Sequence, residues 1–79
     1  MTMKPDRTEA AINLDNQKIG KMYEELANIC VQLCEYDLAR ENFKLSIQFW
    51  EYSNSYRSNE QITIVTKKLK DIERILKNM

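Results

Sequence analysis

The amino-acid sequence predicts an all-α fold of three antiparallel helices. The 79 residues include one Gly and one Pro, and tight turns, β-bulges and phosphate-binding loops all depend on Gly. Apolar residues make up 43% of the chain and recur at spacings of three and four in three long stretches, as in amphipathic helices. The connections between these stretches are short, which makes neighbouring helices antiparallel. We expect the three helices to form a single domain comprising residues 1–79.

The first helix is expected over residues 8–34. Six apolar residues recur along it at helical spacing, interrupted at Asn16, and predict its packed face: Ile12, Ile19, Tyr23, Leu26, Cys30 and Leu33. Gly20 lies within this stretch and weakens the helix by about 1 kcal/mol relative to Ala. The part before Gly20 is therefore expected to fray or bend more readily than the rest.

The second helix is expected over residues 37–55, with Asp37 as its N-cap after a tight connection. It carries two apolar stripes. One comprises Ala39, Phe43, Ile47 and Trp50, with Ser46 beside them, and the other comprises Leu38, Leu45, Phe49, Tyr52 and Tyr56. A helix that is apolar on two sides must be covered on two sides. This helix is therefore predicted to lie between the other two and to bury Trp50 against them.

The third helix is expected over residues 58–78, and Ser58 and Gln61 match the capping-box pattern at its start. Its apolar row continues to the end of the chain: Ile62, Val65, Leu69, Ile72, Leu76 and Met79. The opposite side is a basic face comprising Lys67, Lys70, Arg74 and Lys77. Cations in the last turns complement the helix dipole, so a solvated surface is the simplest interpretation. An acidic partner or a phosphate backbone is the alternative.

The composition argues against catalysis. The chain has no His, and its 12 basic and 12 acidic residues balance. Cys30 and Cys34 lie one helical turn apart, a poor geometry for a disulfide and too few ligands for a metal, so both are expected to pack as small apolar residues. A redox or metal role is the alternative. No stretch has the apolar length of a membrane span. We therefore expect a cytoplasmic protein in a reducing compartment, not an enzyme, with no cofactor and no metal.

Small and aromatic residues in the first two helices resemble the tetratricopeptide repeat (TPR), a helix–turn–helix of 34 residues. The blocks that carry the resemblance are Tyr23-x-x-Leu26-Ala27-x-x-Cys30 and Ala39-x-x-x-Phe43. They lie within residues 20–53, and residues 62–69 repeat the apolar spacing of residues 23–30, like the first helix of a next repeat. The sequence departs from the pattern at Cys34, where the family has a turn Gly, and at Glu51, where it has Pro. A three-helix bundle without repeat architecture is the alternative.

The resemblance implies a non-catalytic protein-interaction module, an adaptor or scaffold that holds a peptide or a partner helix on its first-helix face. The groove-facing residues in the family's register are Lys21, Glu24, Asn28, Val31 and Gln32. One family subtype clamps C-terminal carboxylates with a Lys where this chain has Glu24, so such a ligand is not expected. The alternatives are a self-associating structural bundle and, less favoured, nucleic-acid binding by the basic face.

The short length of the resemblance predicts a partner for the first helix. A TPR-like array usually needs three or more repeats to bury its apolar faces, and this chain has about one and a half. No element of the chain is expected to cover the side of the first helix that carries Met22, Ile29 and Val31. We therefore expect this side, together with the stretch around Ile12 and Leu14, to bind a second copy or an obligate partner.

Overall fold

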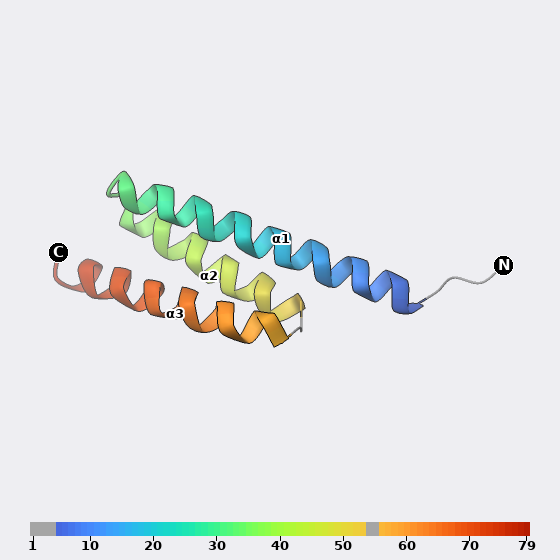
Figure 1. Ribbon diagram of the computed structural model, residues 1–79. Helices are drawn as coiled ribbons and strands as arrows, with labels where there is room; N and C mark the ends of the chain where they lie inside the picture. Colours follow the sequence, from blue (N-terminus) through green and yellow to red (C-terminus); the bar gives the residue numbers. More distant parts are fainter. Residues whose placement is uncertain (1–4, 54–55) are drawn as a thin grey trace.

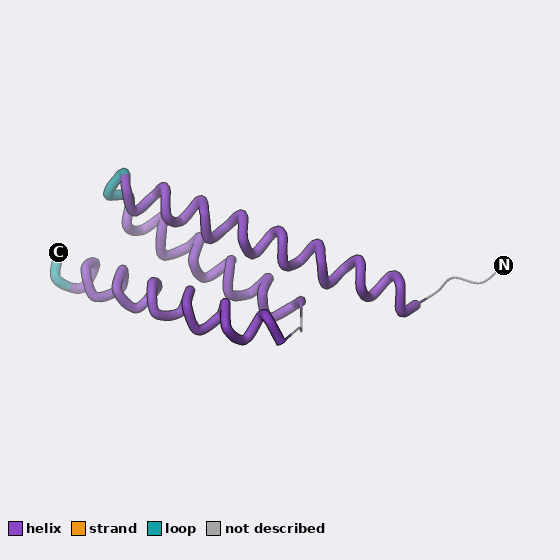
Figure 2. Tube along the Cα trace, in the orientation of Figure 1, coloured by secondary structure: helices purple, strands orange, loops and turns teal. Residues whose placement is uncertain are grey.

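The computed structural model describes residues 5–53 and 56–79, with side chains from Leu14 onward apart from Tyr56. It contains three helices: α1 (Pro5–Gln32), α2 (Tyr36–Ser53) and α3 (Tyr56–Lys77). Within residues 5–53 and 56–79 no strand occurs (Figure 2). The chain reverses direction after α1 and again after α2, so neighbouring helices run in opposite directions (Figure 1). The all-α class predicted from the sequence is confirmed.

The helices pack in the order in which they occur along the chain. α1 and α3 each pack against α2, whereas the contact between α1 and α3 is much sparser. The prediction that the second helix lies between the other two is therefore confirmed. The N-terminal part of α1 projects beyond the ends of α2 and α3 and has no helix of its own chain beside it (Figure 1).

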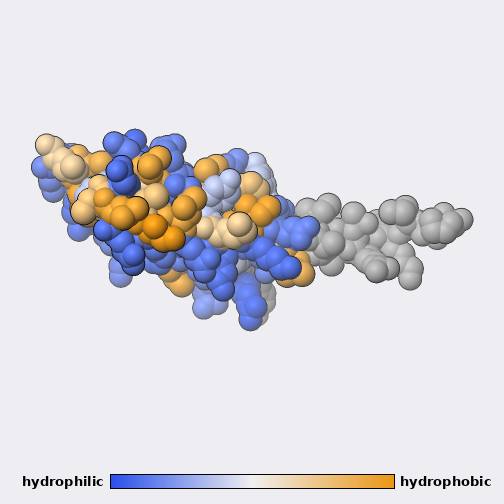
Figure 3. Space-filling view, turned by 90° about the horizontal axis from the view of Figure 1, so that it is seen from above, coloured by the Kyte–Doolittle hydropathy of each residue, from blue (hydrophilic) through white to orange (hydrophobic). Residues whose placement is uncertain are grey.

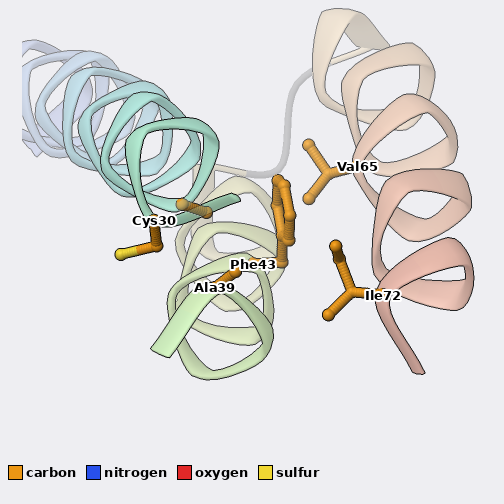
Figure 4. Packing of buried hydrophobic residues seen from close by; sticks show 6 residues of the cluster. Cys30, Ala39, Phe43, Val65 and Ile72 are labelled. Atoms are coloured by element: carbon orange, nitrogen blue, oxygen red, sulfur yellow. The ribbon is translucent and has the colours of Figure 1, made fainter. Parts of the chain in front are cut away.

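The core lies on both sides of α2, and the ring of Phe43 is its centre. Phe43 is 1% exposed and stands between α1 and α3, with Val65 and Ile72 of α3 facing it (Figure 4). Cys30 contributes to the same cluster from α1. Trp50, one turn before the end of α2, is also buried, as predicted from the apolar stripe. Burying each of these large side chains stabilises the fold by about 1.5–3 kcal/mol relative to leaving it exposed.

Small residues allow α1 and α2 to approach closely. Ala27 of α1 and Ala39 and Ser46 of α2 are completely buried. The hydroxyl of Ser46 donates a hydrogen bond of 2.7 Å to the carbonyl oxygen of Gly20 across the interface. A Cβ atom at Gly20 would lie 2.8 Å from Cδ1 of Trp50, so this crossing depends on the absence of a side chain at residue 20.

The apolar row predicted for the first helix mixes two faces, and in this respect the prediction is wrong. Leu26 is 46% exposed and Leu33 is 68% exposed, although both belong to the predicted packed face. The side that packs on α2 instead carries Gly20, Ala27 and Cys30, which are small. Close helix packing selects small residues at the crossing, and the larger apolar residues lie on the neighbouring, uncovered side.

Both predicted N-caps are wrong. α2 begins at Tyr36, one residue before the expected start, and Asp37 lies in its first turn, 3.5 Å from Arg40 in an exposed ion pair. α3 begins at Tyr56, so Ser58 lies inside the helix, where it is buried and hydrogen-bonded to Ser53. The helices end at residues 32, 53 and 77, whereas the expected ends were residues 34, 55 and 78.

The turn between α1 and α2 closes with a left-handed residue at Cys34, which has a φ of 61°. The amide of Glu35 donates to the carbonyl of Cys30 at 2.8 Å, and the amide of Cys34 donates to the carbonyl of Val31 at 3.0 Å. These two bonds define a Schellman motif, in which Gly is the favoured residue at the left-handed position. Cys34 therefore adopts a backbone conformation that favours Gly.

Candidate protein-binding site

A groove lies between α1 and α3, and its cavity has a volume of about 630 Å³. One wall carries Lys21, Glu24 and Asn28 of α1, and the other carries Arg57 and Gln61 of α3. Trp50 of α2 also lines the cavity. We call this feature the α1–α3 groove. It exists because the two outer helices both pack on α2 but hardly on each other.

Glu24 links the two walls of the groove. Its side chain is largely buried, with Oε2 lying 2.9 Å from Nζ of Lys68 and Oε1 accepting a hydrogen bond of 2.9 Å from the amide of Gln61. Both partners belong to α3, so one carboxylate of α1 joins the two outer helices. Its charge is neutralised within the chain, so Glu24 is a structural part of the groove rather than an anion that is free to repel ligands.

The rim of the groove carries charges of both signs. Lys18, Lys21 and Arg57 are exposed cations, and none of them forms an ion pair with another described residue. Glu25 and Glu60 are exposed anions on the same rim. Such a surface offers several hydrogen-bond donors and acceptors around a partly aromatic cavity.

The five residues predicted to face the groove divide into two groups. Lys21, Glu24 and Asn28 line the same cavity. Val31 is half-buried and packs against the core, while Gln32 is the exposed last residue of α1. Neither Val31 nor Gln32 lines this groove. The candidate site therefore comprises the first three residues together with residues of α3.

The residues of α3 in the groove were missed by reasoning from the sequence. Arg57 and Gln61 line the groove, and Lys68 pairs with Glu24 beside it. Spacings of four and seven residues place all three on one side of the helix, next to the apolar row. This spacing was a signal for a polar wall. The opposite wall lies on α1, far away in the sequence, so the spacing on α3 alone does not indicate a groove.

The predicted basic face lies on the outer surface of α3. Lys67, Lys70, Arg74 and Lys77 are all exposed. Lys67 and Lys70 border a shallow hollow of about 340 Å³, and Arg74 and Lys77 lie in the last turn, where the helix dipole favours cations. The basic face is separate from the α1–α3 groove.

Cys34 and Tyr36 interact at the turn between α1 and α2. The phenol of Tyr36 donates a hydrogen bond of 3.8 Å to Sγ of Cys34. This bond and the charge of the neighbouring thiolate at alkaline pH raise the pKa of Tyr36 above its ordinary value of 10.0, with a smaller contribution from burial. Cys30 is buried in the core as expected, whereas Cys34 is exposed at the turn, so the expectation that it packs as a small apolar residue is wrong. Both thiols are free.

A metal-ligand cluster and a membrane-spanning helix are both absent from the part of the chain that the structure describes. Within residues 5–53 and 56–79, no cluster of three or more Cys, Asp or Glu side chains has the arrangement of a metal site. None of the described helical segments combines the length and the apolar character needed to span a membrane.

Comparison of the chain with protein-family models, with curated proteins and with solved structures gives no match.

Proposed function

We propose that this protein is a non-catalytic protein-interaction module, TPR-like in architecture, that binds an extended peptide or a helix of a partner in the α1–α3 groove. The observation that carries the proposal is the groove itself, a cavity of about 630 Å³ between two helices that are held apart by the helix below them. TPR-like proteins bind ligands on the wall formed by the first helix of each repeat. In this proposal α1 and α3 are those helices.

The proposal assigns α2 to the second helix of a repeat and α3 to a C-terminal capping helix. Support for a cap comes from the outer side of α3, where Lys67, Lys70, Asp71 and Arg74 are exposed. Terminal helices of repeat arrays carry a polar outer face that keeps the array soluble. The close crossing at Ala27, Ala39 and Ser46 supports the helix–turn–helix assignment.

The groove is suited to a polypeptide ligand. Lys21 and Asn28 can donate hydrogen bonds to main-chain carbonyls or acidic side chains, and Trp50 provides an aromatic surface. A nucleic-acid backbone fits less well, because Glu25 and Glu60 lie on the same rim and would repel phosphates. We infer binding without catalysis.

Pull-down from cell extract with the 79-residue protein tests the proposal. We expect a specific set of retained proteins that is lost with Lys21→Glu and reduced with Asn28→Ala, because both substitutions alter the groove. Lys70→Glu is the matched control, since it makes the same charge reversal on the basic face, outside the groove. Retention that is lost with Lys70→Glu but kept with Lys21→Glu would contradict the proposal and favour the basic face, and a steep dependence on salt would then indicate nucleic acid.

A further inference from the structure

The uncovered side of α1 carries a continuous apolar row, which we call the α1 seam. Its residues are Ile19, Met22, Leu26, Ile29 and Leu33. Their spacing alternates between three and four, which is the a/d pattern by which one helix packs along another. Met22 and Leu33, near the two ends of the row, are 65% and 68% exposed. The view from above, onto α1, shows the corresponding band of hydrophobic surface (Figure 3).

The α1 seam continues onto α2. The ring of Tyr23 stacks on Phe49 of α2 with their centroids 5.6 Å apart, and Phe49 meets Tyr52 edge to face at 5.7 Å. Phe49 lines a hollow of about 670 Å³ together with Ile19, Met22, Leu26 and Ile29 of the seam, and the walls of this hollow are mostly apolar. Tyr52 and Leu38 of α2 are also more than half exposed. A contiguous apolar surface of this extent is typical of a protein–protein contact.

The outer face of α3 differs from the α1 seam. Its exposed isoleucines, Ile64 and Ile75, are eleven residues apart and are separated by polar and charged side chains such as Lys67 and Asp71. The three packed helices thus present an apolar surface on the outer side of α1 and a polar surface on the outer side of α3. A head-to-tail stack of copies would place the α1 seam against charges, whereas a two-fold contact between two seams buries apolar surface on both sides.

Two charges beside the α1 seam specify the direction of such a contact. Lys18 and Glu25 lie one heptad apart on the same flank of the seam, and both are exposed and without an ion pair among the described residues. In an antiparallel pair of α1 helices, Lys18 of each copy lies opposite Glu25 of the other, which gives two ion pairs. In a parallel pair these residues face the uncharged flank, where Tyr23 and Cys30 lie.

We propose that the α1 seam binds the α1 seam of a second copy of this chain, antiparallel and about a two-fold axis. The N-terminal part of α1 projects beyond α2 and α3 (Figure 1). In the proposed dimer it lies along α1 of the second copy. This contact provides a neighbour for a helical segment that has none in its own chain, and short isolated helices are marginal in water. The α1–α3 groove borders this contact, because Lys18 and Glu25 lie on the rim of the groove as well as beside the α1 seam. The inference rests on the α1 seam and not on what the groove binds.

Sedimentation equilibrium of the 79-residue protein, over about a hundredfold range of concentration, tests the contact. We expect the mass to approach twice 9.4 kDa. Ile29→Glu should raise the dissociation constant by on the order of a hundredfold, because each dimer would bury two unpaired carboxylates. The matched control is Ile64→Glu on α3, since Ile64 is 46% exposed and Ile29 is 51% exposed. Both substitutions are at exposed positions, and circular dichroism checks that each variant is folded.

A charge exchange tests the antiparallel direction. Lys18→Glu and Glu25→Lys should each weaken the dimer by several-fold, and the double exchange should restore it. Asp15→Leu should tighten the dimer, because Asp15 lies one heptad before Met22 in the row and is exposed. A 9.4 kDa monomer at the highest concentration would overturn the proposal. An equal effect of Ile29→Glu and Ile64→Glu would also overturn it, and failure of the double exchange to restore the dimer would overturn the antiparallel direction.

Discussion

Gly20→Ala should destabilise this protein, although Ala is the better helix former. Gly20 lies in the middle of α1, where Ala is favoured over Gly by about 1 kcal/mol in an unconstrained helix. In this structure, however, the added Cβ would lie 2.8 Å from Cδ1, 2.9 Å from Nε1 and 3.1 Å from Cγ of Trp50. Carbon atoms in favourable contact are separated by about 3.5–4.0 Å. Either the indole must move or the two helices must separate.

The magnitude follows from the difference between these two effects. Trp50 is 7% exposed but borders the cavity of the α1–α3 groove, so a shift of its indole can relieve part of the close contact. Overpacking of a tight core costs about 1–3 kcal/mol, from which the gain in helix propensity of about 1 kcal/mol is subtracted. The expected net loss is therefore about 0–2 kcal/mol. The Ser46 hydroxyl, which donates to the Gly20 carbonyl at 2.7 Å, would be displaced by any separation of the helices and adds to the loss.

Urea unfolding followed by far-ultraviolet circular dichroism measures the effect. The control is the difference in the free energy of unfolding between Lys21→Gly and Lys21→Ala, because Lys21 is exposed and next to Gly20. In the background Trp50→Leu, where the indole is absent, Gly20→Ala should become stabilising by about 1 kcal/mol. With Trp50 present, Gly20→Ala could stabilise the protein by as much as the stability difference between Lys21→Ala and Lys21→Gly. In that case the close crossing does not exist and the reasoning fails.

Four further predictions follow from other contacts. Cys34→Gly should stabilise the protein by about 1 kcal/mol in the same unfolding assay, because the φ of 61° strains a residue that has a Cβ, whereas Cys34→Ala should bring no such gain. Ala39→Leu should lower the free energy of unfolding by about 1–3 kcal/mol, because this completely buried residue lies at the crossing of α1 and α2, and no measurable change would place it outside the interface. Lys68→Ala should lower the free energy of unfolding by about 1–3 kcal/mol by removing the cation from a nearly buried carboxylate, while Lys67→Ala at an exposed neighbouring site should have little effect. Absorbance at 295 nm should show that Tyr36 ionises above pH 10.0 and that Cys34→Ala lowers the pKa of Tyr36. The folded chain holds the phenol proton more tightly than the unfolded chain does. The contribution of Tyr36 to stability is therefore complete below pH 10.0 and is lost as the pH rises through the raised pKa.

Much of the fold could be predicted from the sequence, because two of the three helices have an unambiguous apolar side. In α2 the predicted stripe containing Phe43 and Trp50 is the buried one, and in α3 the row containing Val65 and Ile72 packs against α2. These residues are large, apolar and regularly spaced, so periodicity alone identifies them. The middle place of α2 was predicted from two apolar stripes, but Leu38 and Tyr52 of the second stripe are more than half exposed, so the expectation that both stripes are covered is wrong for the second one.

The buried side of α1 could not be predicted in the same way. Leu26 and Leu33 are larger and more hydrophobic than the residues of α1 that pack on α2, so hydrophobicity placed them on the packed face, whereas Met22 and Ile29 are exposed on a side predicted to be uncovered. The packed side depends on Gly20 and Ala27, whose value lies in their small size. The site was predictable only in part for a related reason. The partners of Glu24 on α3 come from a distant part of the sequence, and which polar side chains meet is decided by the angle between helices.

The sequential packing of the helices has a consequence for how this chain folds and opens. Each interface joins helices that are adjacent in the sequence, and α1 and α3 meet mainly through a few polar side chains. Low contact order of this kind is associated with rapid folding, because only short loops must close. It also allows either outer helix to detach while the remaining pair stays in contact. The amide protons of α2 should therefore exchange with solvent most slowly, and the two outer helices should open as separate units of lower stability.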